Sequence, residues 1–210
     1  MADNTLLVII ETLEKINGMY AFALYDRQKN TISLVKDRIG EKPLYYGFNN
    51  GTFFFGSELK SFYPHPNWNP SLDHDAIHLY LRHAYIPTPY SIYKNIFKLE
   101  PGSFVVFDIK NKICSKPKLY WNLIKVISKS TQNRIIMSDS DLVEELDAKL
   151  KRSVQMRMIS DVPIGAFLSG GIDSTLVTSI MNKYSKNKLK TFTIGLKDKT
   201  YDESIHAKKI

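Results

Sequence analysis

The sequence predicts an α+β region followed by an α/β region. Residues 18–56 alternate short aromatic and β-branched runs with turn residues, which is typical of antiparallel strands. Residues 139–195 instead alternate helix and strand patterns, which favours a parallel sheet with crossover helices. A polar stretch without periodicity over residues 123–138 separates the two patterns. We therefore expect domains at 1–122 and 139–210, joined by a linker.

The first region begins with apolar residues at helical spacing, which predicts a helix over residues 4–16 that ends at Asn17 and Gly18. Asn49, Asn50 and Gly51 supply a turn between two strands, because these residues tolerate positive φ. The remaining elements expected here are strands at 19–25, 31–36, 44–48, 52–56, 103–108 and 112–121, and a helix at 73–83.

The second region opens with an amphipathic stripe that runs from Leu142 to Val154 and predicts a long helix. Ser138 and Asp139 precede the stripe and can cap its first turn. The elements expected after it are a strand at 162–168, a helix at 174–184, a strand at 190–195 and the opening of a further helix before residue 210.

Composition excludes several classes of protein. The 210 residues include 43% hydrophobic residues, yet no apolar run approaches the roughly 18 residues that cross a bilayer, and no leader pattern starts the chain. We therefore predict a cytoplasmic protein without a membrane partner. The net charge of +8 comes mostly from scattered lysines without an aromatic recognition motif, so we predict no nucleic-acid partner.

Two groups of potentially reactive side chains have ordinary interpretations. Cys114 is the single cysteine and lies in a strand-like run, so we interpret it as a small buried residue rather than a nucleophile. His74, His78 and His83 lie close together in the sequence, and the first two share a helix face, but no third ligand such as a cysteine or a neighbouring glutamate completes a metal set. We interpret these histidines as partly exposed helix positions.

The residues that carry chemistry follow the apolar run 162–168. Ser169, Gly170 and Gly171 form a turn in which missing side chains let backbone N–H groups approach an anion. The next helix points its positive end at the same place, and Ser174 adds a hydroxyl donor. Asp173 would be repelled by a bare phosphate, so its presence indicates Mg²⁺ bridging it to phosphate oxygens. The sequence therefore predicts an ATP-consuming enzyme.

A simpler interpretation is a Ser-Gly-Gly turn with a polar helix cap. The buried strand before the loop, the helix after it and the second strand favour the phosphate site. The chain lacks the Gly-x-x-x-x-Gly-Lys-Ser/Thr motif, so the loop is not the lysine-bearing type. A loop without lysine suits a site that holds pyrophosphate as a leaving group.

Residues 168–174 resemble the pyrophosphate loop of ATP pyrophosphatases, and together with residues 161–166 and 191–195 they are similar to glutamine-dependent asparagine synthetase. The first region resembles, independently, the later part of the class II glutamine amidotransferase domain of those enzymes. The segments that carry this second resemblance are residues 17–24, 37–46, 56–60 and 81–102.

The resemblance implies a partial N-terminal-nucleophile amidotransferase sandwich of antiparallel sheets, followed by the start of a parallel-sheet ATP-pyrophosphatase domain. In this family ATP converts aspartate into an aspartyl-adenylate with release of pyrophosphate, and ammonia from glutamine then displaces AMP. The resemblance also allows a homodimer of the full-length enzyme. It assigns ATP and pyrophosphate to Leu168, Ser169, Gly170, Gly171, Asp173, Ser174 and Ile194, with Asp173 reaching Mg²⁺ through the phosphates.

The start of the chain departs from the family. The family uses an N-terminal cysteine as nucleophile and further residues to hold glutamine, whereas this sequence begins with Met1 and Ala2. Of the glutamine-binding residues, Asp3 corresponds to a family aspartate only if the alignment slips by one position. We expect no glutaminase nucleophile in this chain, truncation at both ends, and no synthetase activity from the chain alone.

Two other functions stay open from the sequence. One is a related adenylating amidotransferase that acts on another acceptor, because the acceptor pocket of such enzymes lies beyond the region that corresponds to Ile210. The other is a non-catalytic remnant that binds nucleotide, which the missing nucleophile favours. Aspartate-dependent exchange between ATP and pyrophosphate separates the three.

Overall fold

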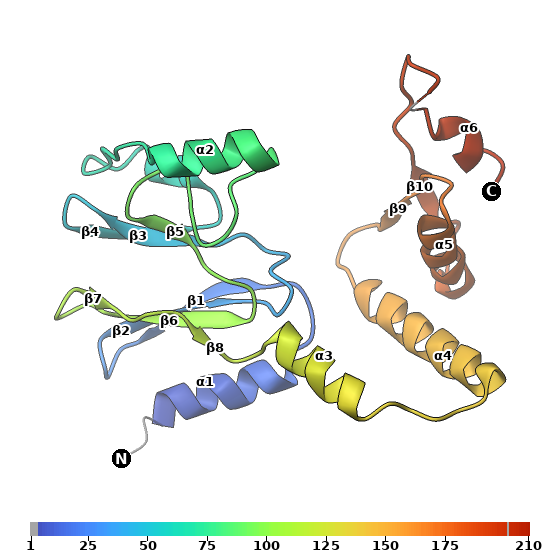
Figure 1. Ribbon diagram of the computed structural model, residues 1–210, viewed down its shortest axis with the longest axis horizontal. Helices are drawn as coiled ribbons and strands as arrows, with labels where there is room; N and C mark the ends of the chain where they lie inside the picture. The colour runs from blue at the N-terminus through green and yellow to red at the C-terminus, as the bar shows by residue number, and fades with distance from the viewer. Residues whose placement is uncertain (1–3, 201) are drawn as a thin grey trace. The chain divides into compact units, whose positions relative to one another are not determined.

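The structure is a computed structural model that describes residues 4–200 and 202–210 (Figure 1). The chain divides into two compact units, one up to Asn133 and the other from Arg134. We describe each unit by itself. None of the helices within the described ranges is long and apolar enough to cross a membrane.

The first unit contains two antiparallel sheets. The larger sheet has the strand order β1 (Ala21–Asp26), β2 (Thr31–Lys36), β6 (Ser103–Asp108) and β7 (Ile113–Cys114), with β8 (Lys118–Leu119) also on β6. The smaller sheet has the order β4 (Thr52–Gly56), β3 (Tyr45–Asn49) and β5 (Ile96–Lys98). All of these pairings are antiparallel, as the aromatic and β-branched runs predict.

The two sheets face each other, and helices lie on their outer sides (Figure 1). Helix α1 (Asn4–Lys15) packs Ile9 and Leu13 against Val35 of the larger sheet. The outer side of the smaller sheet is covered by the 3-10 helix η1 (Leu59–Phe62) and the loop that holds Trp68, on the same side as α2 (His74–His83).

The core of this unit lies between the sheets. Leu34, Leu99 and Val105 are fully buried there, and each such side chain contributes about 1.5–3 kcal/mol relative to exposure. The rings of Phe53 and Phe107 stack at a centroid distance of 4.0 Å and join the two sheets. Leu34 and its neighbour Val35 are both buried, in the clusters on opposite faces of β2, so this strand is covered on both sides.

The second unit is a βαβ unit with a long helix before it. Helix α4 (Asp139–Arg157) leads to β9 (Gly165–Phe167), α5 (Ile172–Tyr184) and β10 (Lys190–Phe192), and the short helix α6 (Ser204–Ala207) follows. Strands β9 and β10 are parallel, with Ala166 opposite Thr191. A small core joins the elements, made by Val154, Ala166, Ile180 and Met181.

Several element boundaries differ from the prediction. The expected strand at 162–168 is shorter and begins after Pro163, whose missing N–H cannot join a ladder. The expected strand at 112–121 is two short strands, because Pro117 interrupts it. The expected linker contains helix α3 (Leu123–Gln132), whose first turn is capped by the Asn122 side chain accepting from the Lys125 N–H at 3.0 Å.

Candidate functional site

The predicted loop joins the end of β9 to the start of α5. The Leu168 N–H donates to the Phe192 carbonyl at 2.9 Å, and the Thr193 hydroxyl donates to the Leu168 carbonyl at 2.6 Å. These bonds continue the parallel pairing past the ends of both strands. Residues 168–169 and 193–194 therefore lie side by side at the carboxyl edge of the sheet, where ligands bind in open α/β sheets.

The two glycines of the loop have different conformations. Gly170 has a φ of +85°, a value that side-chain-bearing residues rarely adopt. Gly171 has φ −73° and ψ 161° and is the N-cap residue of α5. Gly170 therefore turns the chain, and Gly171 starts the helix.

The start of α5 is open to an anion. Gly171 has no side chain to cap the first turn, and its own N–H donates to the Ser169 hydroxyl at 3.4 Å. The first helical bond comes only from the Thr175 N–H to the Gly171 carbonyl, at 3.0 Å. The earlier N–H groups of the first turn and the positive end of the helix dipole are thus left for an external acceptor.

Two serine hydroxyls stand beside these N–H groups. The Ser174 hydroxyl donates to the Gly171 carbonyl at 3.1 Å, and the hydroxyls of Ser169 and Ser174 lie 2.9 Å apart. Because the Ser174 proton is directed to the carbonyl, Ser169 donates in this pair. The backbone N–H of Ser169 also points at the Ser174 oxygen, at 3.4 Å. These hydrogen bonds join the two ends of the loop to each other.

The other predicted site residues have different environments. Asp173 lies exposed in the first turn of α5, and Leu168 is buried with 6% of its surface exposed. Ile194 follows Thr193 at the same edge, and its side chain is 73% exposed. The structure thus brings together all the predicted ATP and pyrophosphate residues. Asp3, predicted to bind glutamine, lies outside the described residues.

Thr193 is a residue that the sequence analysis did not assign to the site. Its signal in the sequence is a hydroxyl near the end of the second predicted parallel strand. A cavity of about 300 Å³ lies behind the loop between α5 and β10, and Thr175 and Thr178 contribute to its wall. Both threonine hydroxyls are buried without a hydrogen-bond partner within the described residues, so the cavity is polar enough to hold water.

In the first unit, Asp37 is a buried carboxylate, with only 1% of its surface exposed. It accepts backbone N–H groups from Gly40 at 2.6 Å, Glu41 at 2.9 Å, Lys42 at 3.0 Å and Tyr20 at 3.4 Å. Burial alone would raise the pKa of Asp37, but these donors outweigh it and lower the pKa below its ordinary value. Asp37 therefore fixes the loop between β2 and β3.

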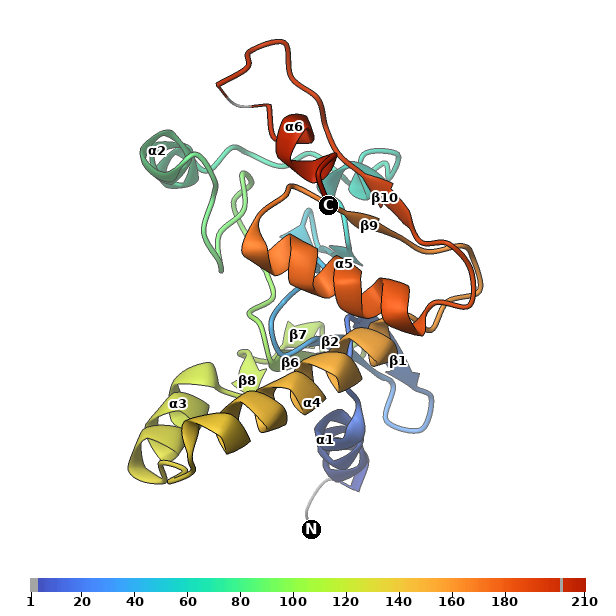
Figure 2. The same cartoon turned by 90° about the vertical axis from the view of Figure 1, so that its right-hand side faces the viewer.

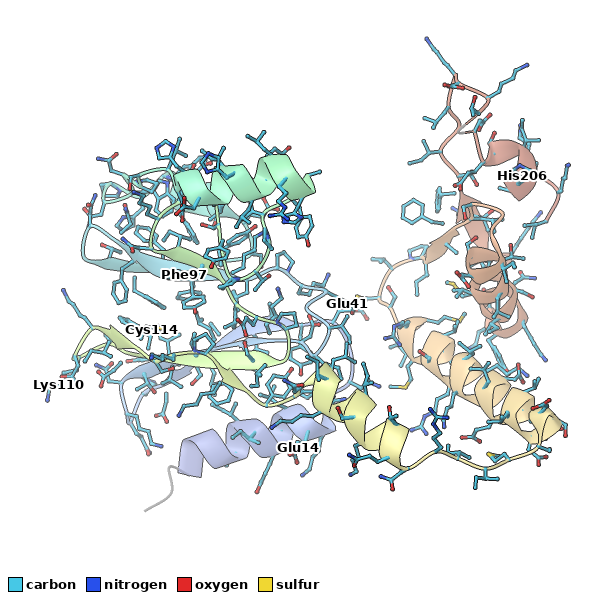
Figure 3. All side chains as sticks on the ribbon, viewed as in Figure 1. Glu14, Glu41, Phe97, Lys110, Cys114 and His206 are labelled. Atoms are coloured by element: carbon cyan, nitrogen blue, oxygen red, sulfur yellow. The ribbon has the colours of Figure 1, made fainter. Side chains whose placement is uncertain are left out.

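Cys114 lies between the two sheets, on β7, with Phe97 facing it from the smaller sheet (Figure 3). Both residues line a cavity of about 310 Å³ together with the rings of Tyr46, Phe48 and Phe53. Burial raises the pKa of the thiol to about 11. A thiol in this environment stays protonated near neutral pH and is a poor nucleophile.

Comparison with known families decides the relationship. The family model described as glutamine amidotransferase domain matches residues 9–121, which is more than half of the chain. The chain belongs to this family. The model described as asparagine synthase matches residues 145–210. The Asp37 loop thus lies within the amidotransferase match and the glycine loop within the asparagine synthase match.

Several known proteins match nearly the whole chain. This chain is 39% identical over 201 residues to a putative glutamine-hydrolysing asparagine synthetase 2 of Methanocaldococcus jannaschii. The alignment covers 94% of this chain and 37% of the relative. It is 31% identical to asparagine synthetase 1 of Bacillus subtilis, covering 92% of this chain and 29% of the relative. It is 30% identical to asparagine synthetase 3 of the same organism, covering 90% and 30%. The chain therefore spans about a third of the length of these relatives.

Proposed function

We propose that this chain is part of an ATP-dependent, glutamine-hydrolysing asparagine synthetase. The proposed overall reaction converts aspartate, ATP and glutamine into asparagine, AMP, pyrophosphate and glutamate. Its relatives, by name glutamine-hydrolysing asparagine synthetases, support the reaction class. The role proposed for the second unit is to hold the pyrophosphate end of ATP while it leaves.

The uncapped first turn of α5 carries this proposal. The site needs donors aimed at the departing phosphates, because negative charge accumulates there in the transition state. The N–H groups after Gly171 supply such donors, and the hydroxyls of Ser169 and Ser174 stand at the same place, 2.9 Å apart. Gly170, with its φ of +85°, makes the turn that leads the chain from β9 into this first helical turn.

The donor set also fits Mg²⁺ held through the nucleotide. The described residues contain no group of three or more His, Cys, Asp or Glu side chains that could hold a metal ion. Mg²⁺ usually binds ATP phosphates and water with one or two carboxylates, and the exposed Asp173 in the first turn of α5 supplies one. The ion would neutralise phosphate charge there.

The same sheet edge suits the nucleoside end of ATP. The backbone at Leu168 and Ile194 is proposed to border the adenine. The hydrogen bond from Thr193 to Leu168 supports this, since it holds the two backbone segments together at the carboxyl ends of β9 and β10. The parallel pairing of these strands supports the start of a parallel-sheet ATP-pyrophosphatase domain.

The first unit is proposed to be part of an N-terminal-nucleophile amidotransferase sandwich. Its facing antiparallel sheets and the family match over residues 9–121 support this. The boundary between the compact units at Asn133 lies inside the proposed linker of residues 123–138 and supports domains at 1–122 and 139–210. The glutamine contact of Asp3, a homodimer and a cytoplasmic location stay predictions.

Binding of ATP to the 210-residue chain tests the nucleotide site. We expect weak, Mg²⁺-dependent binding that Asp173→Asn reduces at least ten-fold, because a metal ligand is lost. Asp139→Asn is the matched control, since Asp139 is also exposed in the first turn of a helix. Equal losses in both variants, or full binding by Asp173→Asn at limiting Mg²⁺, would contradict the assignment.

A chimera tests the reaction. In it this chain replaces the corresponding third of the Methanocaldococcus jannaschii relative, which keeps the rest of the relative's sequence. We expect ATP–pyrophosphate exchange that requires aspartate and is lost with Asp173→Asn. Exchange that needs a different carboxylic acid would favour the related adenylating amidotransferase. The absence of exchange in a folded, ATP-binding chimera would favour the non-catalytic remnant.

A further inference from the structure

The glycine of the loop is in direct contact with α6. A Cβ built on Gly170 would lie 2.6 Å from the Cβ of His206 and 3.0 Å from the backbone nitrogen of Ala207. Both ribbon views place α6 beside the connection between β9 and α5 (Figures 1 and 2). The side chain of His206 therefore starts at the surface of the phosphate loop, although it is 36 residues further along the chain.

Local hydrogen bonds hold α6 in this position. The Asp202 carboxylate accepts the N–H of Ser204 at 3.1 Å and that of Leu196 at 3.4 Å. Leu196 follows β10, the strand that pairs with β9, so Asp202 ties the start of α6 to the sheet that carries the loop. These bonds help to keep α6, and with it His206, in contact with Gly170.

The loop itself does not supply a positive side chain. Residues 168–175 contain no lysine, arginine or histidine, and Asp173 is their one charged residue. If only N–H and hydroxyl groups of the protein held a pyrophosphate group, no positively charged side chain would neutralise its negative charge. His206 is a basic residue in contact with the loop at Gly170, and it is exposed.

We propose that His206 is a further phosphate-binding residue, which donates an imidazole N–H from α6 to the anion held by residues 169–174. This inference rests on the proposed function of the loop and adds a donor from a separate helix. Figure 3 labels His206 on this helix. The ligand is a pyrophosphate group, either free or at the end of a nucleoside triphosphate. Both offer the same charged oxygens to the His206 N–H.

Proton NMR of the five histidines provides a test with internal controls. The other four, at positions 65, 74, 78 and 83, all belong to the first unit. The 210-residue chain is titrated with inorganic pyrophosphate and Mg²⁺, and then with ATP and Mg²⁺, while the backbone amides of 169–174 are followed. His206→Ala identifies the His206 resonance. We expect both ligands to shift the His206 Cε1 proton and to leave the other four unchanged.

Affinity gives a second readout. His206→Ala is expected to weaken Mg²⁺-pyrophosphate binding about ten-fold or more, because one hydrogen bond to a charged acceptor is lost. His206→Gln, which keeps an N–H donor, is expected to recover part of the loss, and His83→Ala is expected to match the unaltered chain. Folding of each variant is checked by its amide spectrum.

The outcomes separate this inference from the function on which it rests. If the amides of 169–174 respond while His206 does not, or if His206→Ala binds as tightly as the unaltered chain, the inference is overturned and the phosphate loop stands. If neither the amides of 169–174 nor His206 respond to either ligand, both are overturned.

Discussion

The Thr193 hydroxyl donates a 2.6 Å hydrogen bond to the Leu168 carbonyl, across the ends of two parallel strands. This bond ties the exit of β10 to the residue that enters the phosphate loop. We predict that Thr193→Val weakens Mg²⁺-pyrophosphate binding and lowers the stability of the second unit by about 1 kcal/mol, the usual contribution of one hydrogen bond. Thr191→Val is the control, because within the described residues the Thr191 hydroxyl makes no hydrogen bond. Equal effects of the two substitutions would show that the bond is unimportant.

The two loop glycines should respond differently to an added methyl group. At Gly170 the methyl would meet His206 at 2.6 Å and the backbone has a φ of +85°, so Gly170→Ala should displace α6 and destabilise the second unit. At Gly171 a Cβ would lie 3.5 Å from the Ser169 hydroxyl oxygen and 4.0 Å from that of Ser174, both ordinary contacts. Amide exchange in the second unit should therefore rise in Gly170→Ala alone, whereas both variants should lose pyrophosphate affinity. Unchanged exchange in Gly170→Ala would contradict the contact.

Asp37 should make the first unit sensitive to acid. Its folded pKa is below the unfolded value, which is about 4, so its contribution is fully present above that pH and is lost as pH falls through the folded pKa. Asp37→Asn should lower the free energy of unfolding at pH 7 by about 2 kcal/mol and flatten this acid dependence. Urea unfolding at several pH values measures both. Glu41→Gln, in the same loop and exposed, should change neither; an equal loss in that variant would argue against the Asp37 network.

Cys114 should react slowly with alkylating reagents. Burial raises its pKa to about 11, so at pH 8 the folded chain holds far less thiolate than the unfolded chain, whose cysteine has a pKa of about 8.5. We expect iodoacetamide to label the folded chain at least about ten-fold more slowly than the chain in urea. Cys114→Ser should leave any release of glutamate from glutamine unchanged. Fast labelling in the folded state, or glutamate release that the substitution abolishes, would identify a nucleophile.

The sequence predicted most elements because their signals are local. The alternating runs of β2 and β4 and the apolar stripe of α4 each depend on neighbouring residues, and those elements are present. Helix α3 was missed because its serines and lysines hide a helical spacing of exposed apolar residues. The strand before the glycine loop was predicted too long. Its expected limits followed the apolar run 162–168, whereas backbone pairing with β10 sets the observed limits of β9.

The site likewise has parts that local sequence signals predict and parts that they do not. Glycine and serine spacing is a local property, so the loop at 169–174 could be predicted from sequence. Thr193 and His206 lie 19 and 32 residues beyond the end of that loop, and only the pairing of β10 with β9 and the return of α6 bring them to it. No pattern within one segment reports such contacts.

The most direct test of the central claim is a titration of the 210-residue chain with Mg²⁺-ATP, followed through its backbone amide spectrum. We predict that the largest changes fall on residues 169–174, with smaller ones at 193–194, and that Asp173→Asn removes them at limiting Mg²⁺. Changes confined to the first unit, or a loop that does not respond at millimolar ATP while the second unit remains folded, would contradict it.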